Sequence, residues 1–295
     1  MWWLSSSADF ARSGFIVHTR SMPHVTHAGA RIWWEESGEG DPLLLVMGLG
    51  ATLDWWNRLK PSLTPRYRTI LFDNRGAGQS DVPPGPYSIP LMADDALAVL
   101  DAAVVASAHV VGLSMGGYIA QELVLQYPER VRALVLGCTS CGGREAVRAA
   151  PEVASAMAAR AKLPRDDAMW GMVPYTFDAS TPRQRIAQDL AMRLRSPVSN
   201  EGYFAQFQAI REWKGSYDRL SAVAAPTLVI HGETDQLVPP ENGRILARAI
   251  SNARLVLLPN ASHIFLTDQL EPARDAILAF LDQASADTAA IKALM

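Results

Sequence analysis

The segment Gly112-Leu113-Ser114-Met115-Gly116 is the strongest candidate for chemistry in this chain. It stands between an apolar run typical of a buried strand and a stretch with the three- and four-residue spacing of an amphipathic helix. A serine on so tight a turn is held in strained backbone geometry, and side chains two residues away on either side would clash, so glycines are needed there. The turn lifts the hydroxyl clear of the sheet and aims a helix N-terminus at developing negative charge. We therefore predict that Ser114 is a nucleophile, with an incidental glycine turn as the alternative.

A serine hydroxyl is a weak nucleophile until a base takes its proton, and the chain has six histidines. His263 lies in a loop just beyond the apolar run Leu255–Leu258, at the strand end where open α/β sheets place their sites. His109 and His231 fall in or at the end of predicted strands, where a hydrogen-bonded core histidine is usual. The remaining three histidines fall in an N-terminal stretch without a structural signal: His18, His24 and His27. We predict His263 as the base.

The imidazole needs an acid that fixes its tautomer and stabilises its charged form. Asp235 follows the apolar run Thr227–Ile230, one predicted strand before that of His263, so the two loops should be neighbours. Glu233 is the alternative in the same loop. With Asp235, the chain order is serine, acid, histidine, the order found when the nucleophile sits on this kind of elbow.

Acyl transfer also needs donors for an oxyanion. Met47-Gly48-Leu49-Gly50 follows the apolar run Leu43–Val46, and its glycines let the backbone approach a ligand closely. We predict an oxyanion hole formed by the backbone N–H groups of Leu49 and Met115. A plain glycine turn is the alternative.

The elements that must position these residues alternate between strands and helices. Short apolar runs bounded by turn residues predict strands buried on both faces: Leu43–Met47, Thr69–Phe72, His109–Leu113, Ala133–Leu136, Thr227–Ile230 and Leu255–Leu258, with a further strand at Ala30–Glu35. Helices are predicted at Leu91–Val105, Met115–Gln126, Glu241–Ile250 and Pro272–Gln283. This alternation predicts an α/β fold with a mostly parallel central sheet flanked by helices.

Residues 142–220 break that rhythm. They contain no strand signal, only helix-like segments rich in Ala, Met and aromatic residues and punctuated by prolines: Pro151, Pro164, Pro174, Pro182 and Pro197. We predict a helical cap inserted into a core formed by residues 23–141 and 221–285. A packing subdomain that does not contact substrate is the alternative. Residues 1–22 are predicted to be a loose N-terminal extension.

Taken in order, these motifs and the stretch Asp73-Asn74-Arg75-Gly76-Ala77-Gly78-Gln79-Ser80 resemble the α/β-hydrolase superfamily, in particular its cap-containing serine esterases and enol-lactonase-like members. The resemblance covers about Val25 to Leu281. It implies that the Asp73 stretch is mainly a structural turn. The family's oxyanion motif often begins with His-Gly, where this chain has Met47, and the residue before the histidine is Ser262 rather than the usual Gly.

Together, these residues predict a carboxylesterase that acylates Ser114 and then hydrolyses the acyl-enzyme, acting on small to medium apolar esters. Alternatives are an enol-lactone type lactonase, a cofactor-free perhydrolase, a carbon–carbon bond hydrolase and a slow-turnover binding protein or receptor. The carbon–carbon hydrolase would have to bind a dienoate carboxylate. The candidate cap arginines are Arg144, Arg148, Arg183, Arg185 and Arg211, for which surface solvation is the simpler interpretation.

Composition excludes several other classes. A net charge of −3 gives no footprint for nucleic acid, and no apolar run reaches the roughly 18 residues of a membrane span. The two cysteines, Cys138 and Cys141, lack a redox or zinc context, and the pair His24 and His27 lacks further ligands. We therefore expect no metal, no cofactor and a small-molecule ester or lactone as partner. We also expect a cytoplasmic location, since the N-terminus is a poor secretory signal, and a monomer or small homo-oligomer.

Overall fold

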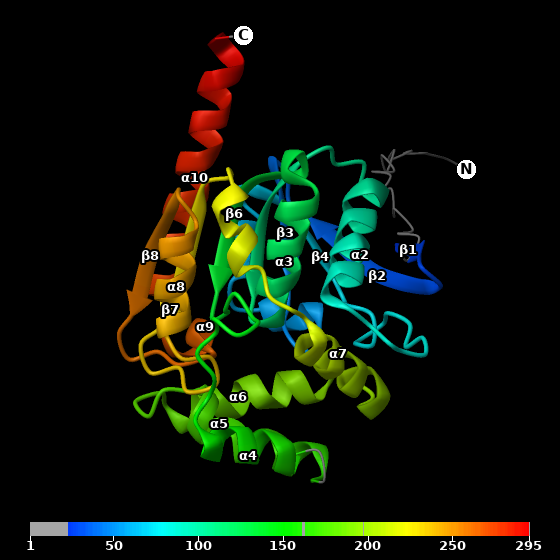
Figure 1. The fold of residues 1–295 in the computed structure, drawn as a ribbon, viewed down its shortest axis with the longest axis vertical. Coiled ribbons are helices and arrows are strands. Elements are labelled where there is room, and N and C mark those ends of the chain that lie inside the picture. Colours follow the sequence, from blue (N-terminus) through cyan, green and yellow to red (C-terminus); the bar gives the residue numbers. More distant parts are fainter. Residues whose placement is uncertain (1–22, 161–162, 197, 295) are drawn as a thin grey trace, which may run out of the picture.

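The computed structural model describes residues 23–160, 163–196 and 198–294, in which eight strands form one sheet with the order β1-β2-β4-β3-β5-β6-β7-β8 (Figure 1). The strands are β1 (His24–His27), β2 (Ala30–Ser37), β3 (Asp41–Val46), β4 (Tyr67–Phe72), β5 (Ala108–Leu113), β6 (Val131–Gly137), β7 (Thr227–Gly232) and β8 (Ala253–Leu258). The pairs β1–β2 and β2–β4 are antiparallel, and the remaining neighbours are parallel. The predicted α/β fold class with a mostly parallel sheet is confirmed.

Helices cover both faces of the sheet because its central strands are apolar on both sides. In β3, Leu44 and Val46 join one hydrophobic core, whereas Leu43 and Leu45 join the other, as the alternation of side chains along a strand requires. Three helices contribute to the first core: α2 (Ile89–Ala102), α3 (Met115–Gln126) and α8 (Glu241–Ala249). Three others contribute to the second: α1 (Lys60–Leu63), α9 (Phe265–Asp268) and α10 (Leu270–Leu294).

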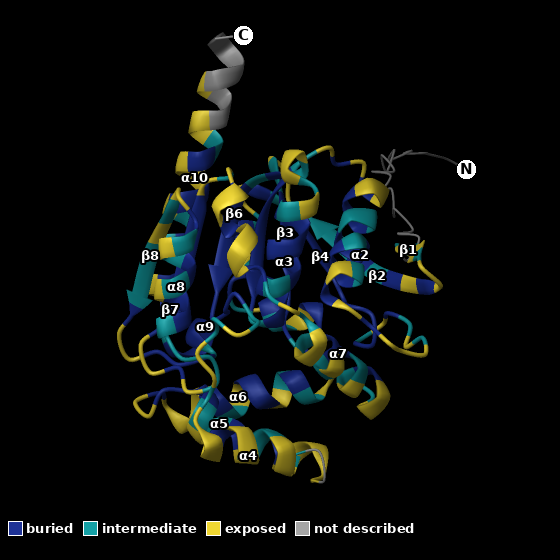
Figure 2. Cartoon of the chain, viewed as in Figure 1, coloured by how far each residue is buried: buried dark blue, intermediate teal, exposed yellow. Residues whose placement is uncertain are grey.

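A group of helices interrupts the sheet between β6 and β7. It consists of α4 (Pro151–Arg160), α5 (Arg165–Thr176), α6 (Arg183–Leu194) and α7 (Asn200–Glu212), and Figure 1 shows it gathered beyond one end of the sheet. Its outward surface carries many exposed residues, while the central strands of the sheet are buried (Figure 2). Hydrogen bonds join it to the core, one of them from Ile264 N–H to the carbonyl of Thr176 at 2.9 Å. No strand interrupts this group in the described part of residues 142–220.

One sequence prediction was wrong. His24 and His27 do not lie in an unstructured stretch but belong to the edge strand β1, which the sequence hides because three of its four residues are polar and none of the four is buried. Pro174, one of the prolines that punctuate the predicted helical segments, lies inside α5. The predicted extension 1–22, which includes His18, lies outside the described residues.

Candidate active site

Ser114 occupies the turn between β5 and α3 with a φ of +56°, in the left-handed region that a side chain rarely adopts. The flanking glycines leave the necessary room: a Cβ at Gly112 would overlap the carbonyl oxygen of Gly116, and a Cβ at Gly116 would overlap that of Val46. Thr139 fixes the turn from the next strand end by donating its hydroxyl to the Ser114 carbonyl at 2.7 Å. Strain of this kind persists only where surrounding contacts enforce it, and it is typical of functional sites.

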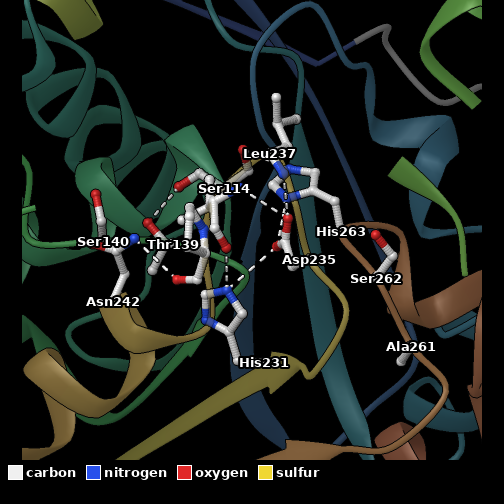
Figure 3. A network of polar contacts seen from close by, with 12 residues as sticks. Ser114, Thr139, Ser140, His231, Asp235, Leu237, Asn242, Ala261, Ser262 and His263 are labelled. Atoms are coloured by element: carbon white, nitrogen blue, oxygen red, sulfur yellow. Dashed lines mark hydrogen bonds and ion pairs between the residues drawn. The ribbon is translucent and has the colours of Figure 1, made fainter. Parts of the chain in front are cut away.

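The structure brings Ser114, His263 and Asp235 together (Figure 3). His263 Nε2 lies 3.1 Å from Ser114 Oγ, and His263 Nδ1 lies 2.9 Å from Asp235 Oδ2. His263 follows β8 and Asp235 follows β7, and these strands are parallel neighbours, so their carboxyl ends meet at one edge of the sheet. Since the carboxylate accepts the proton on Nδ1, the Nε2 lone pair faces the serine hydroxyl. This is the geometry that a serine nucleophile and its base require.

The Asp235 carboxylate is buried and surrounded by donors. Oδ1 accepts the backbone N–H groups of Leu237 and Val238, both at 2.9 Å, and His231 Nε2 lies 3.3 Å from Oδ2, on the side away from His263 (Figure 3). Burial alone would raise the pKa of this carboxyl, but the attraction of His263 and the hydrogen bonds from both histidines outweigh it and lower the pKa to about 2. Asp235 is therefore ionised at neutral pH.

The other acid and base candidates lie elsewhere. Glu233, the alternative acid, is exposed. His109 is a buried core histidine bonded to Ser285 Oγ at 2.9 Å, and burial lowers its pKa to about 4. His231 was expected to be a core histidine as well, and its Nε2 does lie 2.8 Å from the carbonyl oxygen of Val238. Sequence reasoning missed its second contact, with Asp235, although the spacing of four residues offered a signal.

The two predicted oxyanion donors flank the nucleophile. Neither the Leu49 N–H nor the Met115 N–H has a hydrogen-bond partner within the described part of the chain. A Cβ at Gly48 would stand 3.0 Å from Ser114 Cβ, so this loop approaches the serine as closely as its backbone allows. Two free N–H groups beside a serine hydroxyl are suited to hold a developing oxyanion.

Two amides hold the Leu49 loop in place, and neither was predicted. Asn74 donates to the carbonyl of Met47 at 2.8 Å, so the backbone at Met47 is anchored without the histidine common in this position. Gln206, fully buried in α7, accepts from Gly50 N–H at 2.9 Å and donates to the carbonyl of Arg75 at 2.8 Å. The inserted helices therefore support the Leu49 loop directly.

The Asp73 stretch is a structural turn, as predicted. Its carboxylate accepts the N–H groups of Leu53 and Gln79, each at 2.8 Å, and the Ser80 hydroxyl donates to the Asp73 carbonyl. Burial raises the pKa of Asp73 to about 6, against the effect of its two backbone donors. Within the same turn, Arg75 pairs with the buried Asp95 at 2.6 Å. The two cysteines are also structural, being buried and not joined to each other.

A cavity of about 290 Å³ opens over Ser114 and His263, between the core and the inserted helices. Much of its wall is apolar and includes five methionines: Met47, Met115, Met157, Met169 and Met172. Phe177, Tyr203 and Phe207 are the aromatic residues that α5–α7 and their connections contribute. Such a cavity fits a small to medium organic substrate.

The cavity wall also carries charge. Arg58, Arg160, Arg193 and Asp189 line it, whereas none of the five cap arginines considered from the sequence belongs to its lining. Arg183, for example, stacks on Trp170, and Arg185 reaches the carbonyl of Thr267 at 3.3 Å. The sequence signal that could have distinguished Arg193 is its spacing of four residues from Asp189 on a helix, which allows an ion pair.

The described ranges contain neither a helix that could span a membrane nor a cluster of metal-binding side chains. In the described ranges, no helix is both long and apolar enough to cross a membrane. In the same ranges, no three His, Cys, Asp or Glu side chains gather as a metal site would require.

Comparisons with known proteins place the chain in a family. The model of the alpha/beta hydrolase fold family matches residues 41–269. A poly(3-hydroxyalkanoate) depolymerase from Ectopseudomonas oleovorans is 33% identical over 243 residues, 82% of this chain and 84% of that protein. A thermophilic esterase from Thermogutta terrifontis superposes with a TM-score of 0.77 at 29% identity, over 89% of this chain and 98% of that one. The enol-lactonase from Burkholderia xenovorans LB400 does so with a TM-score of 0.76 at 28% identity, over 88% and 100%.

Proposed function

The chain belongs to the α/β-hydrolase fold family, and from that premise we propose that it is a serine esterase that hydrolyses carboxylic esters with small to medium apolar groups. The observation that carries the proposal is the contact chain from Ser114 Oγ to His263 Nε2, 3.1 Å, and from His263 Nδ1 to Asp235 Oδ2, 2.9 Å. The similarity to a polyester depolymerase and to an esterase agrees with it.

In this proposal, His263 Nε2 takes the proton of Ser114 as Oγ attacks the ester carbonyl carbon. The carbonyl oxygen becomes an oxyanion that accepts hydrogen bonds from Leu49 N–H and Met115 N–H. The tetrahedral intermediate then expels the alcohol, which receives the proton from His263. A water molecule attacks the acyl-enzyme in the same way, and the acid leaves as Oγ regains its proton. Asp235 stays ionised and stabilises the imidazolium.

We also propose that residues 142–220 act as a cap that shapes the substrate cavity over a core formed by residues 23–141 and 221–285. Support comes from the cavity wall, to which α4–α7 contribute, and from Gln206, which ties α7 to the oxyanion loop. A cytoplasmic location and a monomeric or small homo-oligomeric state stay predictions from the sequence.

The test is hydrolysis of p-nitrophenyl esters of increasing acyl length, with Ser114→Ala as the control variant. We expect turnover on short and medium chains and a fall of more than about 1,000-fold in kcat in the variant. Ser107→Ala, which changes a serine at the opposite end of β5 from Ser114, serves as a matched control for nonspecific damage. Absence of turnover on every ester by the folded protein would contradict the proposal.

A lactone is the second candidate substrate class, favoured by the similarity to an enol-lactonase over 88% of this chain. A lactone is an internal ester, so the same residues act and the alcohol remains attached to the acyl group. Parallel assays with five- and six-membered lactones decide between the two classes. A kcat/KM at least about tenfold higher for lactones than for open esters would assign the chain to the lactonases. That ratio corresponds to about 1.4 kcal/mol in transition-state binding.

A further inference from the structure

Arg193 is a buried cation in the wall of the substrate cavity. Its side chain is 8% exposed, and its guanidinium lies 3.8 Å from the centre of the Trp55 ring and 5.7 Å from that of Phe177. Within the described residues, its one polar side-chain contact is the ion pair from Nη2 to Asp189 Oδ2 at 2.7 Å, which does not have hydrogen-bond geometry, and its buried Nε has no hydrogen-bond partner. A guanidinium has five N–H donors, so most of this group's capacity is unused.

The charge around Arg193 is not balanced either. Asp189 is shared with a second arginine, since Arg58 Nε lies 3.3 Å from Asp189 Oδ1. Arg160, stacked over Tyr203, adds a third cation to the cavity lining, and Asp189 is the one carboxylate among the described residues of that lining. Burial lowers the pKa of Arg193 to about 10, with Asp189 opposing the change, so the guanidinium is still charged at neutral pH.

A buried cation with unused donors in an otherwise apolar cavity is unfavourable unless an anion completes its coordination. The planar guanidinium matches a carboxylate, which it can bind through two parallel hydrogen bonds. The stacking on Trp55 holds the guanidinium plane in a fixed orientation, which reduces the entropy lost on binding.

We propose that Arg193, assisted by Arg58, is a specificity subsite for a carboxylate at the end of the substrate remote from the scissile bond. This inference rests on the proposed esterase function. The preferred substrate class is then a half-ester of a dicarboxylic acid, or a lactone that bears a carboxylate, rather than a neutral ester. Asp189 is a positioning residue that holds both guanidinium groups.

The experiment compares charged and neutral substrates of equal length. Monomethyl glutarate, adipate and pimelate are assayed by acid release against methyl pentanoate, hexanoate and heptanoate. We expect the wild-type protein to prefer the half-ester at one chain length. In Arg193→Met, the ratio of kcat/KM for that half-ester to kcat/KM for its neutral partner should fall about 10- to 100-fold, the effect of a hydrogen-bonded charge pair. Arg193→Lys should retain part of the preference.

Arg183→Met is the matched control, because Arg183 is also a cap arginine stacked on an aromatic ring but does not line the cavity. Its ratio should equal that of the wild-type protein. Should Arg193→Met fail to fold, Arg58→Gln is the second variant, and a smaller fall in the same ratio is expected. Equal kcat/KM for charged and neutral substrates at every length, or an Arg193→Met variant that loses both equally, would overturn the subsite.

Failure of the esterase proposal is separable from failure of the subsite. If the wild-type protein hydrolyses no ester, the Ser114→Ala protein is titrated with adipate by calorimetry. The double variant, Ser114→Ala with Arg193→Met, is titrated in the same way. Binding that disappears with Arg193 supports the subsite without any turnover. Absence of binding to the Ser114→Ala protein, or binding that survives the loss of Arg193, would overturn it.

Discussion

His231 offers a quantitative test of the arrangement around Asp235. Its Nε2 lies 2.8 Å from the carbonyl oxygen of Val238, so this nitrogen carries the proton and also points at Asp235 Oδ2, 3.3 Å away. Its Nδ1 is buried without a hydrogen-bond partner in the described structure, so the polar contacts of the ring are made through Nε2. We predict that His231 is a positioning residue that helps to hold the carboxylate towards His263.

The magnitude follows from the environment of the carboxylate. Lowering its pKa from 3.8 to about 2 favours the charged form by about 2 kcal/mol in total. A hydrogen bond to a charged group contributes about 1.5–3 kcal/mol, and the contact from His231 is long and shared with Val238, so the lower end applies. His231→Leu should therefore reduce kcat about tenfold, since 1.4 kcal/mol corresponds to a factor of ten. His231→Gln, which keeps an N–H near the same position, should retain most of the activity.

The assay is steady-state hydrolysis of the best p-nitrophenyl ester, with the free energy of unfolding of each variant measured separately in urea. A double-mutant cycle with Asp235→Asn tests the route of the effect, because coupled residues are not additive. In the Asp235→Asn background, His231→Leu should cause little further loss. The reasoning is refuted if the folded His231→Leu protein keeps the wild-type kcat, or if it loses the same factor with and without Asp235.

Two further predictions concern the turns that support the site. Thr139→Val removes the 2.7 Å hydrogen bond to the Ser114 carbonyl and should lower the free energy of unfolding by about 1 kcal/mol. Urea denaturation measures this free energy. Thr139→Ser, which keeps the hydroxyl, should be closer in stability to the wild-type protein. Asp73 has a folded pKa of about 6, above its unfolded value of 3.8, so the folded state binds its proton more tightly. Relative to Asp73→Asn, the wild-type protein should therefore lose up to about 3 kcal/mol of stability as the pH rises from 3.8 through 6. A parallel pH dependence of unfolding in the two proteins would contradict that assignment.

The sequence by itself predicted the elements that hold the chemistry. Continuous apolar runs indicate strands buried on both faces, and the glycines around Ser114 indicate a turn that only small residues permit. The positions of Asp235 and His263 were predictable for the same reason: each follows a strand, and parallel neighbouring strands end at the same edge of the sheet. These are local signals, so they can be interpreted without knowledge of the tertiary contacts.

Only the tertiary structure decided which residues line the cavity. Arg193 and Asp189 lie on α6 and Arg58 lies near α1, and nothing in their local sequence indicates that they share one cavity. Gln206 lies on α7, and nothing in its local sequence indicates that it holds the Leu49 loop. Their spacing along helices predicts amphipathic faces but not which face meets the core, because helix packing depends on long-range contacts. The positions of the candidate triad were therefore predictable from strand ends, whereas the charge of the cavity depends on how the inserted helices pack over them.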